Sequence, residues 1–189
     1  MVTVPIFYAT GEGQARRIAQ RLAAAFHARG LESAPVDLQQ GEEAGIDWTT
    51  VGGVVVGASI HVGRHQAPAV RFAEKHAREL STRPSAFFSV SMSEASKNPR
   101  DVAAARALAQ GFVDHAHWRP DFVVSLAGAL RYSKYGWLTR LVMKHISRRE
   151  GGPTDTSRDY EFTDWAAVDR LAEQLAARIH AAPPVAAAG

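Results

Sequence analysis

The stretch VTVPIFYATGEGQA, residues 2–15, joins an apolar run to a glycine-rich loop and is the strongest indication of the fold class. Residues 2–9 are almost continuously apolar, as in a strand covered on both faces, although Pro5 is unusual in a central strand. From Gln14 apolar residues recur at helical spacing as far as residue 29, and Gly30 ends the pattern. A strand that leads through a glycine loop into a helix predicts the start of a βαβ unit.

The loop between that strand and helix has the composition of a phosphate-binding turn. Glycines let the backbone turn tightly and aim successive N–H groups at one point. The helix N-terminus adds positive potential at the same point, so a phosphate can be held without any Lys or Arg. An ordinary turn, with glycines for geometry alone, remains the alternative. The loop is Thr10-Gly11-Glu12-Gly13-Gln14-Ala15.

Two other kinds of phosphate loop fit less well. A P-loop requires a Lys after its last glycine, and no Lys follows these glycines. A dinucleotide fingerprint requires a third glycine where Arg16 stands, although Asp37, at the end of the second predicted strand, is placed to meet a ribose. The sequence therefore favours a mononucleotide and weakens the dinucleotide alternative without removing it.

The rest of the chain continues the alternation of strands and helices. Strands are predicted at residues 2–9, 32–38, 51–57, 85–91 and 122–129, and helices at 14–29, 68–80, 101–115 and 164–181, with Thr163 as the N-cap of the last. This alternation predicts an α/β fold with a doubly wound parallel sheet of five strands, order 2-1-3-4-5, and helices on both faces. We expect one domain over residues 1–182, with an extra basic segment at 131–162, and a disordered tail at 183–189.

Two further loops follow strands at their carboxyl ends, where ligands bind in open α/β sheets. Residues 57–65 (GASIHVGRH) and 89–98 (SVSMSEASKN) are rich in small and polar residues suited to a flat heterocycle. His61, His65 and Arg131 are the candidate catalytic residues, although solvent-exposed loop histidines without a role explain the first two equally well. The predicted cofactor-binding residues are Thr10, Gly11, Glu12, Gly13, Gln14, Ala15, Ser59, Ile60, His61, Val62, Gly63, Ser89, Val90, Ser91, Met92 and Asn98.

Composition excludes several classes of site. The 189 residues include no cysteine, which removes disulfides, thiolate metal sites and a dithiol redox centre, so electron chemistry would require a bound cofactor. We predict no metal site. The first residues lack the basic start of a signal peptide, and no apolar run approaches the roughly 18 residues of a spanning helix, so we expect a cytoplasmic protein. The sequence leaves open whether copies of the chain associate.

Residues 122–149 contain no Asp or Glu but six Lys and Arg residues, which marks an anionic partner. Residues 135–149 (YGWLTRLVMKHISRR) fit a helix with an apolar face and a basic face, which suits an anionic membrane surface along 131–149. An ordinary helix packed on the domain is the alternative. Nucleic acid is not expected, because no recognised motif accompanies the charge.

Taken together, several motifs make the chain resemble the flavodoxin-like, menaquinone-dependent protoporphyrinogen IX dehydrogenases over roughly residues 3 to 180. The resemblance implies an enzyme of haem biosynthesis that binds flavin mononucleotide (FMN), oxidises protoporphyrinogen IX and passes the electrons to a membrane quinone. It also implies that the opening loop binds the FMN phosphate, that residues 59–63 and 89–98 surround the ring, and that the protein works at the inner face of the cell membrane. The motifs are TGEGQ, VVVGASIHVGRHQAPAVRFAEKHA, PSAFFSVS, HWRPDFVVSLAGALRYSKYGW and GGPTDTSRDYEFTDW.

Two departures from the family pattern keep other functions open. The last loop position is usually Thr or Ser and here is Ala15, and the aromatic that often follows the third strand is replaced by Val62, so that Tyr132 or Tyr135 would have to stack on the ring. A flavodoxin-type electron carrier or a quinone reductase without porphyrin activity is the alternative function, against which the sequence pI of about 9.5 speaks. A domain of this fold that no longer binds flavin is the third possible function.

Overall fold

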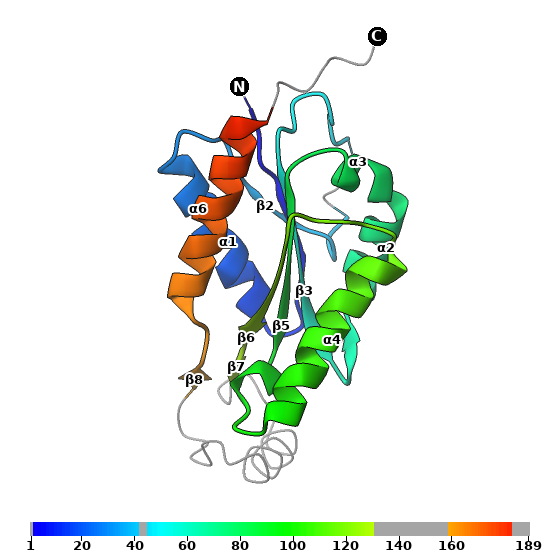
Figure 1. The fold of residues 1–189 in the computed structure, drawn as a ribbon, viewed down its shortest axis with the longest axis vertical. Coiled ribbons are helices and arrows are strands. Elements are labelled where there is room, and N and C mark those ends of the chain that lie inside the picture. Colours follow the sequence, from blue (N-terminus) through cyan, green and yellow to red (C-terminus); the bar gives the residue numbers. More distant parts are fainter. Residues whose placement is uncertain (1, 42–44, 131–158, 183–189) are drawn as a thin grey trace.

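A computed structural model describes residues 2–41, 45–130 and 159–182 of the chain. Its main sheet has the strand order β2-β1-β3-β5-β6, all parallel, with a short β4 antiparallel to β3 (Figure 1). Counting the five parallel strands along the chain, this is the order 2-1-3-4-5, so the predicted doubly wound fold is confirmed. The strands are β1 (Ile6–Ala9), β2 (Pro35–Asp37), β3 (Val54–His61), β4 (Arg64–His65), β5 (Ser85–Ser91) and β6 (Phe122–Ala127).

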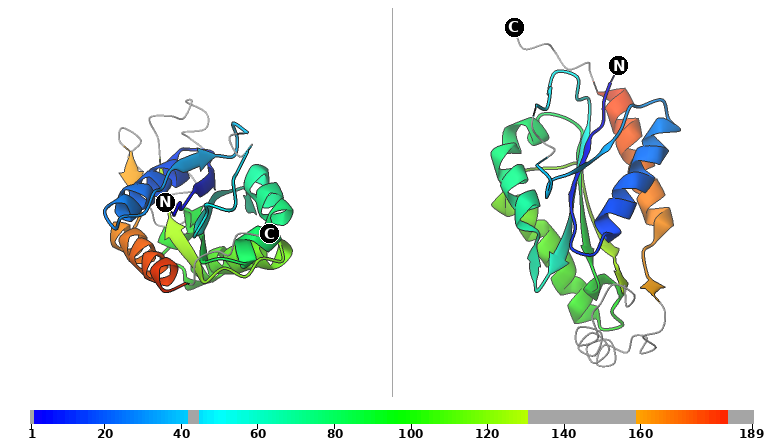
Figure 2. Two further views of the ribbon diagram at one scale, coloured as in Figure 1. Left: turned by 90° about the horizontal axis from the view of Figure 1, so that it is seen from above. Right: turned by 180° about the vertical axis from the view of Figure 1, so that it is seen from behind.

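Helices cover both faces of the sheet. Figure 2 shows α1 and α6 on one face and α2 and α4 on the other. Because successive side chains of a strand point to opposite faces, Ile6 and Tyr8 pack toward α1 and α6, while Phe7 and Ala9 pack toward α2 and α4. This double burial explains why the first strand is apolar at every position. The helices are α1 (Gln14–His27), α2 (Ala67–Lys75), α3 (Ala77–Ser81), α4 (Pro99–His115) and α6 (Trp165–Ala181), with a short 3-10 turn η1 (Ser93–Ala95).

Several predicted boundaries were wrong. The first strand begins at Ile6 and not at residue 2, because Pro5 has no N–H to donate and Thr3 makes only isolated bridges. The predicted helix 68–80 is divided into α2 and α3 at His76. The third strand continues to His61, so that what the sequence presented as a loop is a hairpin with β4.

A close contact between β3 and β5 depends on a glycine. Gly57 lies directly opposite Phe88 in the parallel register, and both residues are buried. A Cβ atom at Gly57 would lie 1.9 Å from the Cζ atom of Phe88. The absent side chain of Gly57 therefore makes the space that the Phe88 ring fills in the core beneath α1 and α6.

The last part of the chain departs from the prediction at two points. The predicted fifth strand ends at Ala127, and two short strands, β7 (Ala129–Leu130) and β8 (Tyr160–Glu161), form an antiparallel pair beside it. The N-cap of α6 is Asp164 and not Thr163, since the Asp164 carboxylate accepts the amide hydrogen of Ala167 at 3.0 Å. The predicted basic helix at 135–149 and the tail at 183–189 lie outside the described residues.

Candidate functional site

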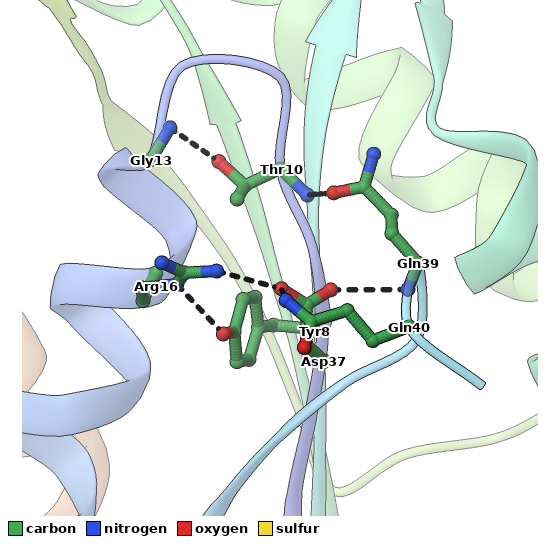
Figure 3. Close-up of polar contacts among 7 residues, drawn as sticks. All are labelled: Tyr8, Thr10, Gly13, Arg16, Asp37, Gln39 and Gln40. Atoms are coloured by element: carbon green, nitrogen blue, oxygen red, sulfur yellow. Dashed lines mark hydrogen bonds and ion pairs between the residues drawn. The ribbon is translucent and has the colours of Figure 1, made fainter. Parts of the chain in front are cut away.

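The loop from β1 to α1 closes on itself through one hydroxyl. The amide of Gly13 donates to Oγ1 of Thr10 at 2.9 Å, and Gly13 adopts a φ of 90°, which glycine reaches without a steric penalty (Figure 3). Gly13 is also the N-cap of α1, so no side chain caps this helix, and its first turn holds no acidic residue. The positive end of α1 is therefore left without a negative partner from its own first turn, as in a helix that receives an anion.

Two amides of the same loop are held by side chains from neighbouring strand ends. The amide of Thr10 donates to Oε1 of Gln39, beyond β2, at 3.2 Å (Figure 3). The amide of Gly11 donates to Oγ of Ser59, on β3, at 3.1 Å. Both acceptors are uncharged, so an anion oxygen would be a stronger acceptor than either. The amide donors of the loop therefore lie where the carboxyl ends of three parallel strands come together, which is where a ligand is expected in this fold.

Asp37 is engaged inside the protein. Its carboxylate lies 2.9 Å from Nη2 of Arg16 and accepts the amide hydrogen of Gln39 at 3.0 Å, and its side chain is 5% exposed (Figure 3). Arg16 also donates from Nε to the hydroxyl of Tyr8 at 2.9 Å, and burial raises the pKa of that hydroxyl. The residue that replaces the third glycine of a dinucleotide fingerprint therefore binds the acid that would meet a ribose, which argues against the dinucleotide alternative.

The last two loop residues contribute to packing. The methyl group of Ala15 is completely buried in the core beneath α1 and α6. Gln14 is also buried, and its amide group binds Glu161 and Thr163. Thr10 consequently supplies the only side-chain hydroxyl among the six loop residues, and any further donors to an anion are backbone amides.

The loop after the third strand is the hairpin of β3 and β4. Its two turn residues, Val62 and Gly63, both have positive φ values, 49° and 71°, as a two-residue hairpin turn of the I′ type requires. Val62 is 86% exposed at the tip, while His61 pairs with Arg64 and is exposed beside it. Ser59 and Ile60 precede the tip and are half-buried. The predicted ring-binding residues 59–63 therefore form a projecting arm beside the glycine loop.

His65 points away from this arm and into the protein. Its Nε2 lies 2.8 Å from Oγ of Ser89, and its ring packs edge-on against Phe87 and Phe112 at 5.5 and 5.1 Å between centroids. Burial lowers the pKa of His65 to about 4, so the ring is neutral near pH 7. These contacts explain His65 as a packing residue beneath α4, and they engage the Ser89 hydroxyl as well.

The segment 89–98 separates into two parts. Ser89 and Val90 are buried inside β5 with side chains toward opposite core clusters, so only Ser91 and Met92 stand at the strand end. Ser91 accepts the amide hydrogen of Glu94 at 3.3 Å, which shapes the turn. Asn98 caps α4 by accepting from the amide of Arg100 at 3.1 Å. Arg131, Tyr132 and Tyr135 lie outside the described residues.

Sequence reasoning missed Gln39 and Glu161. The signal for Gln39 was available, because a polar residue just beyond the second strand lies at the same sheet edge as the glycine loop in the order 2-1-3. Glu161 has no comparable signal, since it is far along the chain from the loop. Among the described residues, no group of three or more His, Asp or Glu could hold a metal ion, and no helix is long and apolar enough to cross a bilayer.

Comparisons with known proteins agree with this fold. The sequence pattern of the flavodoxin domain matches residues 5–157. The chain is 36% identical over 171 residues to a protein of Escherichia coli K12 named protoporphyrinogen IX dehydrogenase [quinone], covering 90% of this chain and 93% of that one. It is 38% identical over 131 residues to a Leishmania major protein of the same name, covering 69% of this chain and 56% of that one. A solved flavodoxin from Pseudomonas aeruginosa superposes with a TM-score of 0.54 at 12% identity, covering 95% of this chain and 99% of that one, which shows the fold.

Proposed function

The chain belongs to the flavodoxin-domain family, in the group of the protoporphyrinogen IX dehydrogenases, and from that premise we propose that it is an FMN-dependent oxidoreductase that converts protoporphyrinogen IX to protoporphyrin IX with a quinone as acceptor. Six electrons and six protons leave the porphyrinogen, and three quinones take them up as quinols. Family membership indicates a flavin cofactor. The observation that carries the choice of FMN is the start of α1, where a glycine N-cap and a hydroxyl-closed loop leave the positive helix end to a phosphate.

The described residues divide the binding of FMN between three strand ends. The amides of the loop from Thr10 to Gln14, with the Thr10 hydroxyl, would hold the phosphate, and the amide of Gly11 would exchange Ser59 for a phosphate oxygen. The hairpin arm at residues 59–63 and the β5 end at Ser91 and Met92 would flank the ring. When bound there, the flavin would supply the two-electron redox chemistry between substrate and acceptor, and the protein would supply position and electrostatics.

The hairpin arm also offers the candidate groups nearest the ring. His61 and Arg64 face each other across the exposed end of the arm, where they can approach the propionates of an anionic porphyrinogen. Arg131 and Lys134 are further candidates for the same task, from their place after the fifth strand in the sequence. His65, in contrast, is turned toward Ser89 and the core, so we place the catalytic contacts at His61 and Arg131 first.

A quinone acceptor dissolved in lipid would be reached at a membrane surface. We propose peripheral attachment at the inner face of the cell membrane through residues 131–149, since each basic residue near an anionic bilayer contributes about 1 kcal/mol. Sedimentation with vesicles tests this directly. Binding should rise with the fraction of anionic lipid and fall with salt, whereas equal binding to neutral vesicles would contradict an electrostatic attachment. The basic residues are Arg131, Lys134, Arg140, Lys144, Arg148 and Arg149.

The cofactor proposal is tested by an FMN titration of the purified protein and of Thr10→Val. Removing the hydroxyl deletes one hydrogen bond to an anion and the closure of the loop, so we expect FMN to bind about 10-fold more weakly. Thr3→Val is the matched control, because the Thr3 hydroxyl bonds the carbonyl of Thr50 at the opposite end of the sheet. A wild-type protein that binds no FMN refutes the proposal, and so does equal weakening by both variants.

The substrate proposal is tested by an anaerobic assay with protoporphyrinogen IX and a menaquinone analogue. An enzyme of this kind completes the oxidation without any partner protein. A flavodoxin-type carrier would bind FMN with the same loop but would show no turnover until a partner protein was added. FMN binding without turnover would therefore favour the carrier, and neither binding nor turnover would favour a domain that has lost flavin.

A further inference from the structure

The side chain of Gln14, the first residue of α1, belongs to a buried hydrogen-bond chain. Its Nε2 donates to Oε1 of Glu161 at 2.9 Å and to Oγ1 of Thr163 at 2.8 Å. The Thr163 hydroxyl in turn donates to the carbonyl of Ala127, at the end of β6, at 2.7 Å. Gln14 is 4% exposed and Thr163 is 8% exposed, so water does not compete freely for the bond between these two side chains.

Glu161 joins this chain to a second contact of α1. Its other carboxylate oxygen lies 2.8 Å from Nη1 of Arg17, so one carboxylate binds the first turn of α1 at two points. Glu161 is part of β8 and pairs with Ala129 of β7. These two strands, which we call the β7–β8 ribbon, are separated in the sequence by residues 131–159.

We propose that Gln14 is a positioning residue for the cofactor, which fixes the start of α1, and with it the phosphate loop, against the β7–β8 ribbon. This inference rests on the proposed function, because the cofactor positioned is the proposed FMN. Gln14 acts through Glu161 and Thr163, and its side-chain amide makes no contact with the cofactor.

The geometry explains why this position takes a glutamine. Both hydrogens of its amide nitrogen are used, one toward a carboxylate and one toward a hydroxyl whose own hydrogen is committed to Ala127. An apolar side chain of similar size would leave the buried Thr163 hydroxyl and the partly exposed Glu161 carboxylate without this donor. Gln14 is also the first residue of α1, whose N-terminal end is the proposed phosphate site. A displacement of the Gln14 side chain would therefore displace the loop as well.

Phosphate binding and the position of Gln14 affect each other reciprocally through these bonds. If holding Gln14 in place favours phosphate binding, then phosphate binding must favour the arrangement in which Gln14 meets Glu161. FMN should therefore slow hydrogen exchange in the ribbon, in peptides that cover residues 127–130 and 159–163, although these residues follow the loop by more than 100 positions.

The test compares FMN dissociation constants of the full-length protein, measured by flavin fluorescence. We expect Gln14→Leu and Glu161→Leu each to weaken FMN about 10-fold, and the double variant to lose less than the two losses added together, because both remove the bond between Gln14 and Glu161. Glu161→Gln keeps an acceptor for Gln14 and should stay within about threefold of the wild type. In Gln14→Leu, FMN should no longer slow exchange in the ribbon.

Two controls separate positioning from general attachment of α1. Arg17→Met breaks the second contact of Glu161 but leaves Gln14 bound, and Asp169→Asn breaks the bidentate pair with Arg21 that joins α1 to α6 one turn further from the loop. Both should change the FMN dissociation constant by less than about twofold.

The outcomes are distinct from those of the proposed function. A wild-type protein that binds no FMN refutes the proposed function and this inference with it. Wild-type binding together with unchanged affinity in Glu161→Leu, additive losses in the double variant, or equal losses in the two controls refutes the positioning role alone. Where Gln14→Leu does not fold, the comparison of Glu161→Leu with Glu161→Gln decides the question, since only the first removes the acceptor that residue 161 offers to Gln14.

Discussion

The buried ring of His65 gives the fold a stability that depends on pH. Burial lowers the pKa of His65 from 6.5 to about 4. The folded chain therefore keeps the ring neutral at pH values where the unfolded chain binds a proton. The contribution of the neutral ring to the free energy of unfolding is complete above the pKa of His65 in the unfolded chain. It is lost as the pH falls from about 6.5 toward 4, and it does not change further below pH 4.

The magnitude follows from the width of that interval. Between about pH 6.5 and pH 4.5 the unfolded state binds nearly one more proton than the folded state at this site, and each pH unit costs about 1.36 kcal/mol. The ring keeps some access to water, so we expect His65 to account for about 2 kcal/mol of the loss in the free energy of unfolding at pH 4.5.

The assay is urea unfolding at about pH 7.5 and pH 4.5 for the wild type, His65→Gln and His61→Gln. His65→Gln keeps a polar partner for Ser89 but cannot titrate, so its loss of stability between the two pH values should be smaller than that of the wild type by about 2 kcal/mol. His61→Gln should behave as the wild type, because His61 is exposed on the hairpin arm. Equal losses for the wild type and His65→Gln would show that the ring is not held neutral, and the reasoning would fail.

Two further predictions concern the core and a predicted cofactor residue. Gly57→Ala should destabilise the protein by about 1–3 kcal/mol in urea unfolding, because its Cβ would overlap the Phe88 ring, and Phe88→Leu should relieve much of that cost; additive losses in the double variant would contradict the overlap. Asn98→Ala should cost about 1 kcal/mol as the loss of a helix cap, and Asn98→Ser should restore stability. If Asn98 instead binds the cofactor, Asn98→Ser will weaken FMN while the stability is recovered.

The apolar strands and the apolar faces of the helices are properties of local pattern, and the sequence alone predicted them. Runs such as residues 54–58 (VVVGA) carry no polar side chain on either face, and this pattern is independent of the loops. The glycine loop is local only in part, since the amide of Gly13 bonds Thr10 within the loop, whereas Gln39 and Ser59 come from other strand ends. Strand order followed from these elements because doubly wound sheets permit only a few orders. The loop at 57–65 was harder, because a hairpin turn through Val62 has no usual turn sequence.

The bonding partners of the buried polar side chains could be found only from the tertiary structure. The sequence predicted Asp37 near a ligand, but in the folded protein Asp37 forms an ion pair with Arg16. It predicted Gln14 at the phosphate, but the side-chain amide of Gln14 bonds Glu161, which lies 147 positions away. His65 was predicted at the ligand and faces the core, because the hairpin turns it back beneath α4. Apolar periodicity is a property of each segment and is visible in the sequence. The partner of a buried polar side chain depends on distant segments that become neighbours only when the sheet assembles.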